Sequence, residues 1–318
     1  MSEVQAQFYG GPKECPIENG RIQVQRISPK ISDVGGIPVA RAIPQKERRL
    51  IGPWCFLDHI GPVTDGPELN VGQHPHIGLQ TFTWMLEGEI MHKDSLGSAQ
   101  VIRPKQVNLM TAGHGIAHTE ESVAGHSTMH AAQLWIALPL EHKDTAPRFD
   151  HYPELPTWHD AGVDFTLLIG SWQHQQAPTL HFSPIVAMDL FAAENTELTL
   201  TLDPSFEYAL MPLEGFFRID DQSFNNNDLA YLGMLRESVT VELDADCRIL
   251  LIGGAPLADP VSIWWNFVGH SKDEIAKAQA DWEAHSTRFD TVPGYDGKRL
   301  VPPPIPWRSS AKEWQVNT

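Results

Sequence analysis

"FTWMLEGEI", residues 82–90, and "YALMPLEGFF", residues 208–217, share a pattern that indicates the fold of this chain. In both, an apolar stretch of strand length ends in Leu-Glu-Gly, and a second strand and a turn follow. The two copies then lead into "VNLMTAG" (107–113) and "LAYLGM" (229–234). Two copies of one β unit predict two similar antiparallel barrels in tandem.

The rest of the chain also consists mostly of short stretches rich in β-branched and aromatic residues. Examples are "LQTFTWML" (79–86), "AQVIRP" (99–104), "AAQLWIAL" (131–138), "DFTLLIG" (164–170), "TELTLTL" (196–202) and "CRILLIGG" (247–254). The proline-rich segment 151–160 is the expected boundary, which gives one domain over 1–150 and a second over 151–318. We therefore expect an all-β fold.

One stretch, residues 271–286, predicts a helix near the C-terminus. Ser271 and Glu274 form a capping box, and Ile275, Ala278 and Trp282 share one face. The following "VPPPIPW" (301–307) is too rich in proline for regular structure and is expected to lie extended on the surface.

Composition excludes several classes of protein. The 318 residues carry a formal net charge of −17, which repels phosphate backbones and anionic lipid heads, so we expect no nucleic-acid or membrane partner. The cysteines, Cys15, Cys55 and Cys247, are far apart and include no CxxC pair, which suits a reducing compartment. With no apolar leader or membrane span in the sequence, a cytoplasmic location is expected.

Two residue pairs of the first repeat indicate a metal site. In "HPH", His74 and His76 have the i, i+2 spacing that puts both side chains on one face of a strand. Because the chain has 15 histidines, one such pair is weak evidence by itself. "GHGIAHTEES" (113–122) adds His118 and Glu120 with the same spacing. Three imidazoles and one carboxylate suit Fe(II), and also Mn, Ni, Cu or Zn, with coordination positions left open for substrate.

Other residues near these pairs are weaker candidates. His114 is placed in a glycine turn, His92 is assigned a structural role ahead of one at the rim of the site, and Glu121 is the alternative to Glu120 if the register differs. The remaining neighbours are expected to be structural or solvated: His126, His130, Glu87, Glu89 and Cys55. The second repeat has Thr201 and Asp203 where the first has His74 and His76, and no histidine near 245–247, so it is expected to bind no metal.

These motifs resemble those of the pirin family within the cupin superfamily. The resemblance rests on "FLDHIGP" (56–62), "HPHIGLQTFTWMLEGEIMHKDSLG" (74–97), "VIRPKQVNLMTAGHGIAHTE" (101–120) and "QLWIALP" (133–139). It implies a bicupin, two barrels of jelly-roll type, with one iron in the first barrel. The family's four ligands fall on His74, His76, His118 and Glu120. Many cupins and pirins have glutamate at Gln80, so a role of that carboxylate in tuning the pocket is in doubt here.

The resemblance implies two kinds of function. The first is an oxidoreductase of the quercetin 2,3-dioxygenase type, in which a flavonol is the aromatic substrate, O₂ the co-substrate and Glu120 a candidate base. The second is a non-enzymatic metal- or redox-sensing regulator of transcription, whose acidic surface docks a basic protein. A zinc hydrolase is less favoured, because such sites usually have three protein ligands and an identifiable base. The protein is expected to be a monomer.

Overall fold

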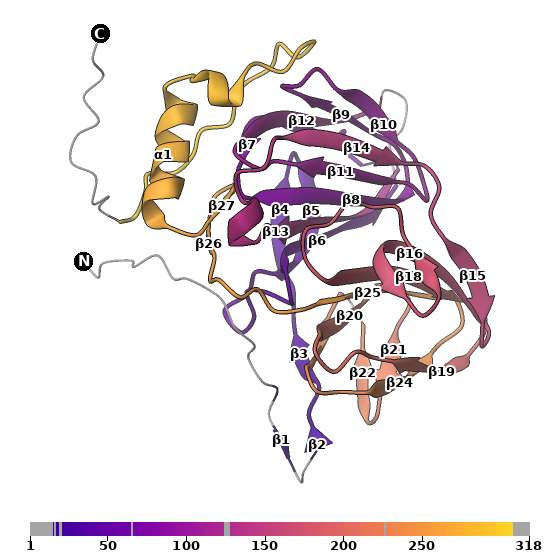
Figure 1. Cartoon of the computed structure of the whole chain (residues 1–318). Coiled ribbons are helices and arrows are strands. Elements are labelled where there is room, and N and C mark those ends of the chain that lie inside the picture. Colours follow the sequence, from indigo (N-terminus) through magenta and orange to yellow (C-terminus); the bar gives the residue numbers. More distant parts are fainter. Residues whose placement is uncertain are drawn as a thin grey trace.

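The computed structural model describes Cys15, residues 17–18, 21–64, 66–123, 128–225 and 227–307. Within these residues the chain is mostly strand, with one α-helix, and it forms two β-barrels (Figure 1). Two short 3-10 helices, η1 (Leu140–His142) and η2 (Thr287–Phe289), lie in connections. The predicted all-β, antiparallel, double-barrel fold is confirmed.

The N-terminal barrel is built from a larger and a smaller antiparallel sheet. The larger sheet has the order β14-β11-β8-β13-β6-β5-β4, with bounds β4 (Lys30–Val34), β5 (Ile37–Ile43), β6 (Trp54–Val63), β8 (Leu79–Glu87), β11 (Val107–Thr111), β13 (Met129–Ala137) and β14 (Arg148–Tyr152). The smaller sheet has the order β10-β9-β12-β7, with bounds β7 (Asn70–His76), β9 (Ile90–Asp94), β10 (Ala99–Ile102) and β12 (Ile116–Ser122).

The C-terminal barrel repeats this plan. Its larger sheet has the order β15-β16-β18-β25-β20-β23-β3, with bounds β3 (Gln25–Ile27), β15 (Thr157–Asp160), β16 (Val163–Trp172), β18 (Ile185–Ala192), β20 (Glu207–Glu214), β23 (Leu229–Gly233) and β25 (Cys247–Gly254); β17 (Gln175–Gln176) pairs with β16. Its smaller sheet has the order β19-β24-β21-β22, with bounds β19 (Thr196–Thr201), β21 (Phe217–Ile219), β22 (Gln222–Phe224) and β24 (Ser238–Leu243).

The internal repeat occupies equivalent places in the two barrels. Leu-Glu-Gly stands at the end of β8 in one and of β20 in the other. In each turn the glycine, Gly88 (φ 84°) or Gly215 (φ 68°), has a left-handed backbone that a side chain would strain. β8 then pairs with β11, and β20 pairs with β23, as the matched sequences predict.

The two larger sheets pack against each other through one face of each. Because side chains alternate along a strand, Phe82 and Trp84 of β8 point toward the C-terminal barrel, while Thr83 faces the interior of its own barrel. The Trp84 indole donates to Asp189 Oδ2 on β18 at 3.1 Å. The apolar residues between the sheets come from both halves and form one continuous core.

The chain crosses between the halves near both ends. β3 precedes the first barrel in sequence, yet it is the edge strand beside β23 in the C-terminal sheet. Conversely, the hairpin of β26 (Ser262–Trp264) and β27 (Phe267–Gly269) reaches the N-terminal barrel, where Phe267 bridges Ile77. A further short hairpin pairs β1 (Ile17–Glu18) with β2 (Arg21–Ile22).

The predicted helix is α1 (Lys272–Glu283), which lies against the N-terminal barrel (Figure 1). The Ser271 hydroxyl caps it by accepting from Glu274 N at 3.1 Å, as expected. The Glu274 carboxylate accepts a hydrogen bond from His270 N. Ile275, Ala278 and Trp282 are buried in a cluster with Ile77 and Phe267, so the helix holds the β26–β27 hairpin in place. No described helix is long and apolar enough to span a membrane.

Candidate metal centre

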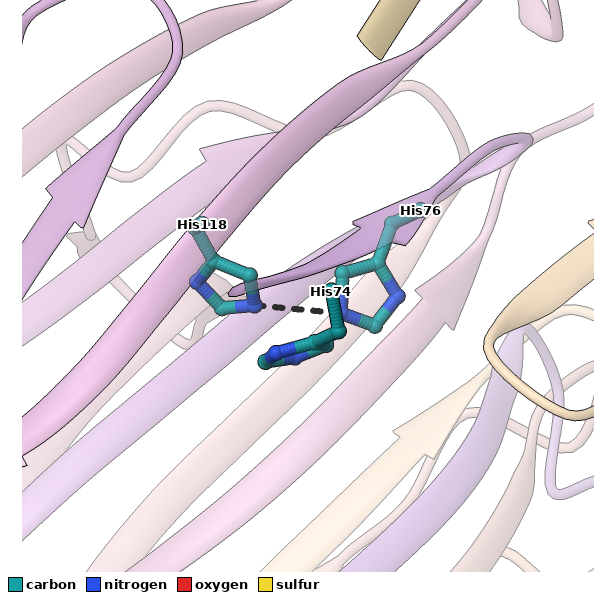
Figure 2. Close-up of side chains that lie close together, drawn as sticks. All are labelled: His74, His76 and His118. Atoms are coloured by element: carbon teal, nitrogen blue, oxygen red, sulfur yellow. Dashed lines mark hydrogen bonds between the residues drawn. The ribbon is translucent and has the colours of Figure 1, made fainter. Parts of the chain in front are cut away.

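Strands β7 and β12 bring three histidines together inside the N-terminal barrel (Figure 2). The antiparallel register sets His118 opposite His74, and Ile116 opposite His76. One ring nitrogen from each histidine lies within 4.8 Å of the others, and His76 Nε2 is 3.1 Å from His118 Nε2. Among the described residues this is the one such group of metal-ligating side chains.

A bulge in β7 positions the His74 ring. The pairing moves from His118–His74 to Glu120–Val71, so β7 has one residue more than β12 across this step. Gly72, one of the two residues in this bulge, accepts through its carbonyl oxygen from His74 Nδ1 at 2.8 Å. Glycine is required there because a Cβ would run into the backbone oxygen of Lys298.

Two of the three rings have their tautomer set by the backbone. A carbonyl oxygen can only accept, so His74 Nδ1 donates to Gly72 and His76 Nδ1 donates to Asn266 O at 2.9 Å. The Nε2 atom of each neutral ring then keeps its lone pair. Burial lowers the pKa of His74 to about 4 and holds the pKa values of His76 and His118 well below their usual range. The cluster is therefore neutral and able to donate lone pairs near pH 7.

Glu120 lines the same cavity as the histidines but stands outside the group of atoms within 4.8 Å. In the part of the chain that the structure describes, its carboxylate has no hydrogen-bond or ion-pair partner. Burial raises the pKa of this carboxyl to about 7. An unpartnered carboxylate in the same cavity as three neutral imidazoles fits a divalent cation. The cation would neutralise the carboxylate charge and accept the lone pairs of the imidazole nitrogens.

The cavity has a volume of about 420 Å³, within the range of small-molecule sites. Apolar side chains make up much of its wall: Val34, Val39, Ile60, Leu69, Val71, Ile90 and Leu300. Phe56 and Trp135 stack at 4.1 Å, and the Trp135 ring meets His76 edge-on at 5.1 Å. This wall is suited to a flat, mostly apolar molecule that reaches the histidines.

A few polar groups interrupt the apolar wall. Arg41 binds Asp58 through two hydrogen bonds, of 2.8 and 2.7 Å, and its guanidinium covers the Phe56 ring. Gln133 accepts from Thr83 at 2.6 Å, which leaves its amide N–H groups free to meet a ligand. These groups can orient a ligand that carries oxygen atoms at its edge.

The C-terminal segment completes the cavity. Trp265, Asn266 and Leu300 line it although they follow the second barrel in sequence. Leu300 N donates to Gln73 O at 2.8 Å, next to His74. Trp265 has a φ of 53°, a left-handed conformation that is unusual for a bulky residue. Sequence reasoning missed these residues, since the only local signal was the tryptophan pair before Asn266.

Gln80 lies on the other side of β8 from the cavity. It is fully buried, with Phe82 and Trp84 on the face that meets the C-terminal barrel. Its Nε2 donates to Thr111 Oγ1 at 3.0 Å and to Leu180 O at 3.3 Å. Since the cavity lining does not include it, Gln80 does not stand beside the histidine cluster as the sequence interpretation assumed.

His92, for which the sequence favoured a structural role, contacts both Asp94 and His118. Its Nε2 is 3.2 Å from Asp94 Oδ2 and its Nδ1 is 3.3 Å from His118 Nδ1. His114 is exposed in its turn, as expected, where its backbone carbonyl accepts from Arg288.

The carboxylates near the site have other partners. Glu121 pairs with Lys93 at 3.1 Å, which leaves Glu120 as the acidic residue of this strand that lines the cavity. Glu89 pairs with Arg103, and Glu87 is exposed at the Leu-Glu-Gly turn.

The remaining candidates lie away from the histidine cluster. His130 is buried between the barrels, 2.8 Å from His59. Cys55 is a free core residue, and burial raises its pKa. His126 lies outside the described residues.

The second barrel is filled where the first is hollow. A cluster of apolar side chains that includes Leu198, Phe217 and Phe224 occupies its interior. Thr201 and Asp203, the counterparts of the first histidine pair, are exposed, and Asp203 accepts from Ser205.

The fold and the site together define a bicupin with a three-histidine cluster in its first barrel. The family description "Pirin" matches residues 36–136, and "Pirin C-terminal cupin domain" matches residues 187–290. The chain belongs to the pirin family, as its motifs indicated.

Individual relatives agree with this assignment. A Pseudomonas aeruginosa protein, provisionally named a quercetin 2,3-dioxygenase, is 53% identical over 94% of this chain and 96% of its own length. A pirin-like protein of Caulobacter vibrioides is 34% identical over 86% of this chain and 96% of its own. The crystal structure of a quercetin 2,3-dioxygenase from Acinetobacter baumannii matches with a TM-score of 0.88 and 45% identity, covering 90% of this chain and 97% of that one.

Proposed function

We propose that this protein is a mononuclear iron enzyme that cleaves a flavonol ring with O₂, holding one Fe(II) through His74, His76, His118 and Glu120. The observation that carries the proposal is the shared cavity, in which three neutral imidazoles and an unpartnered carboxylate face a wall suited to a flat aromatic molecule. The names of two similar proteins, from P. aeruginosa and A. baumannii, support the flavonol as substrate.

The donor set suits Fe(II), and also Mn, Ni, Cu or Zn, with positions left open for substrate. When bound, such a metal supplies a Lewis acid that lowers the pKa of a coordinated hydroxyl, and iron also supplies one-electron chemistry that O₂ requires. The residues of the chain would perform the remaining tasks: binding, orientation, exclusion of water and proton transfer.

Binding and orientation fall to the cavity wall. Trp135, whose ring stacks on Phe56, offers aromatic surface beside His76. Arg41 and Gln133 carry N–H groups that can donate to hydroxyl or keto oxygens at the edge of a flavonol. Trp265 and Leu300 cover the same cavity from the C-terminal segment and would keep water from the reacting ring.

Glu120 is the candidate proton acceptor. Burial raises the pKa of its carboxyl to about 7 in the metal-free protein, and in the metal-loaded protein Glu120 would serve both as a ligand and as the proton acceptor. A flavonol must lose its hydroxyl proton before the ring reacts with O₂, and Glu120 is the acidic group of β12 that lines the cavity. In protein shown to hold one metal per chain, Glu120→Gln should therefore lower turnover more than it lowers affinity for the flavonol.

The test is anaerobic loading with Fe(II), followed by quercetin and then O₂. Ring cleavage should bleach the flavonol absorbance and release one CO for each O₂ consumed. Loading with Mn, Ni, Cu and Zn in parallel identifies the active metal. Absence of turnover with all five metals, in protein shown to hold one metal per chain, would reject the activity for this substrate.

The regulatory alternative draws support from the net charge of −17, which favours docking to a basic protein. It predicts that metal-loaded and metal-free protein differ in affinity for such a partner while neither bleaches quercetin. A positive turnover assay together with equal partner affinities would reject it.

A further inference from the structure

A chain of three side chains leads away from the histidine cluster into the smaller sheet. β9 pairs with β12 so that Asp94 lies opposite His118 and His92 lies opposite Glu120. His92 reaches between them: its Nε2 is 3.2 Å from Asp94 Oδ2, and its Nδ1 is 3.3 Å from His118 Nδ1. The order Asp94–His92–His118 thus ends on the ring that faces His76.

The chain is held rigidly at its far end. Asp94 is fully buried, and its Oδ1 accepts from the backbone N–H groups of Leu96 at 2.9 Å and Ser98 at 3.0 Å. Phe149 of β14 stacks on the His92 ring at 4.3 Å with an angle of 15°. Neither side chain can turn without breaking these contacts, so the atoms that face each other are defined.

The positions of the protons follow from these contacts. Burial acts to raise the pKa of Asp94, but hydrogen bonds from His92 and Ser98 lower it overall, so the group is a carboxylate that only accepts. His92 Nε2 therefore donates to this carboxylate, which leaves His92 Nδ1 as the atom that can accept. His118 therefore donates through Nδ1, and its Nε2 lone pair faces His76 Nε2 at 3.1 Å.

We propose that His92 and Asp94 are positioning residues for the metal centre, which fix the tautomer and the ring orientation of His118. Backbone carbonyls fix the rings of His74 and His76. For His118 the side chains of His92 and Asp94 take this role. The role rests on the histidine cluster as a metal site and is independent of the flavonol activity. Removing such an outer partner of a ligand typically lowers metal affinity by about 10- to 100-fold.

Asp94→Asn tests the proposal with almost no change of shape. The asparagine oxygen can still accept from Leu96 and Ser98, while its NH₂ group would donate to His92 Nε2. That reverses the His92 tautomer and sets two N–H groups against each other at His92 and His118. Nickel(II) affinity, measured by competition with a coloured chelator, should fall by about 10- to 100-fold. Unchanged affinity would overturn the proposal.

Asp189→Asn is the matched control. Asp189 is also a buried carboxylate bound to a ring N–H, but it lies in the second barrel. It should keep wild-type nickel affinity, even if thermal unfolding shows some loss of stability. An equal loss of affinity in both variants would mean that general destabilisation is responsible, and would overturn the role of Asp94.

A measurement on wild-type protein decides the matter if Asp94→Asn does not fold. In the metal-free protein, long-range ¹⁵N–¹H correlations distinguish the two neutral histidine tautomers. We expect the proton on Nε2 of His92 and on Nδ1 of His118. The opposite assignment at either ring would overturn the proposal. Because no readout involves turnover, a failed quercetin assay would reject the activity and leave the positioning role standing.

Discussion

The Nδ1 atom of His76 donates a hydrogen bond of 2.9 Å to the backbone carbonyl of Asn266, a residue 190 positions later in the chain. The first belongs to the N-terminal barrel and the second to the turn of the β26–β27 hairpin. A ring of the candidate metal centre is therefore oriented by a segment that follows the second barrel. Metal binding should therefore depend on the β26–β27 hairpin as well as on the N-terminal barrel.

Replacing His76 or His118 with alanine should reduce bound metal from about one per chain to near zero, because each removes a nitrogen from the three-histidine cluster. Metal content of protein purified without chelators or a nickel column, measured by mass spectrometry, checks this. His130→Ala is the control: this histidine is equally buried but lies between the barrels. It should lose stability and keep its metal. Metal that stays near one per chain in His118→Ala would show that the ligands lie elsewhere.

Gln80→Glu should leave metal content unchanged and lower the free energy of unfolding by about 1 to 3 kcal/mol. The substitution removes the donor to Thr111 and Leu180, and it places a carboxylate at a fully buried position between the barrels. Urea unfolding and metal analysis test the two parts separately. A gain in metal affinity would contradict the position of Gln80 on the far side of β8.

Trp265→Gly should weaken the binding of an aromatic ligand by roughly tenfold, because the indole supplies part of the cavity wall. Metal content should stay the same, since the Asn266 carbonyl is retained and glycine adopts the left-handed backbone of this position without strain. Anaerobic titration of Fe(II)-loaded protein with quercetin gives the affinity. Trp264→Phe, at the neighbouring indole outside the cavity lining, should bind like wild type.

Acid should destabilise the protein through the histidines between the barrels. Burial lowers the pKa of His59 to about 4 and that of His130 to about 4, from an unfolded value near 6.5. The unfolded chain therefore binds more protons between these values, so their contribution to stability is complete above pH 6.5 and is lost as the pH falls through 4. The free energy of unfolding in urea, measured from pH 7 to 4, should fall less steeply in His130→Gln. Equal slopes would contradict this.

Much of the fold was predictable because strand alternation and the repeated Leu-Glu-Gly turn are local signals. The same alternation predicted that His74 and His76 share one face of a strand; the facing strands expected from sequence are instead paired neighbours in one sheet, where the ring nitrogens of His74, His76 and His118 come together. Glu120, two residues after His118 on the same strand, also lines the cavity. The bulge at Gly72 has no comparable signal, because an extra residue in a strand depends on what packs behind it.

The outer parts of the site were not predictable from sequence. His92 precedes a turn in the sequence and shows no metal-ligand spacing. Only the pairing of β9 with β12 shows that it reaches His118. Trp265 and Asn266 are brought to the cavity by contacts of very long sequence separation. The sequence interpretation placed Gln80 in the pocket because it follows the HPH motif closely. On β8, however, Gln80 shares a face with Phe82 and Trp84, and this face meets the other barrel.

The exchange of segments between the halves has a consequence for the order of events during synthesis. A ribosome makes the chain from the N-terminus, so the three histidines exist long before residue 266 emerges. Until then His76 lacks its acceptor, the cavity lacks the wall formed by Trp265 and Leu300, and β3 has no β23 to pair with. We therefore expect stable metal binding at this site only late in synthesis, after Asn266 and Leu300 have been made.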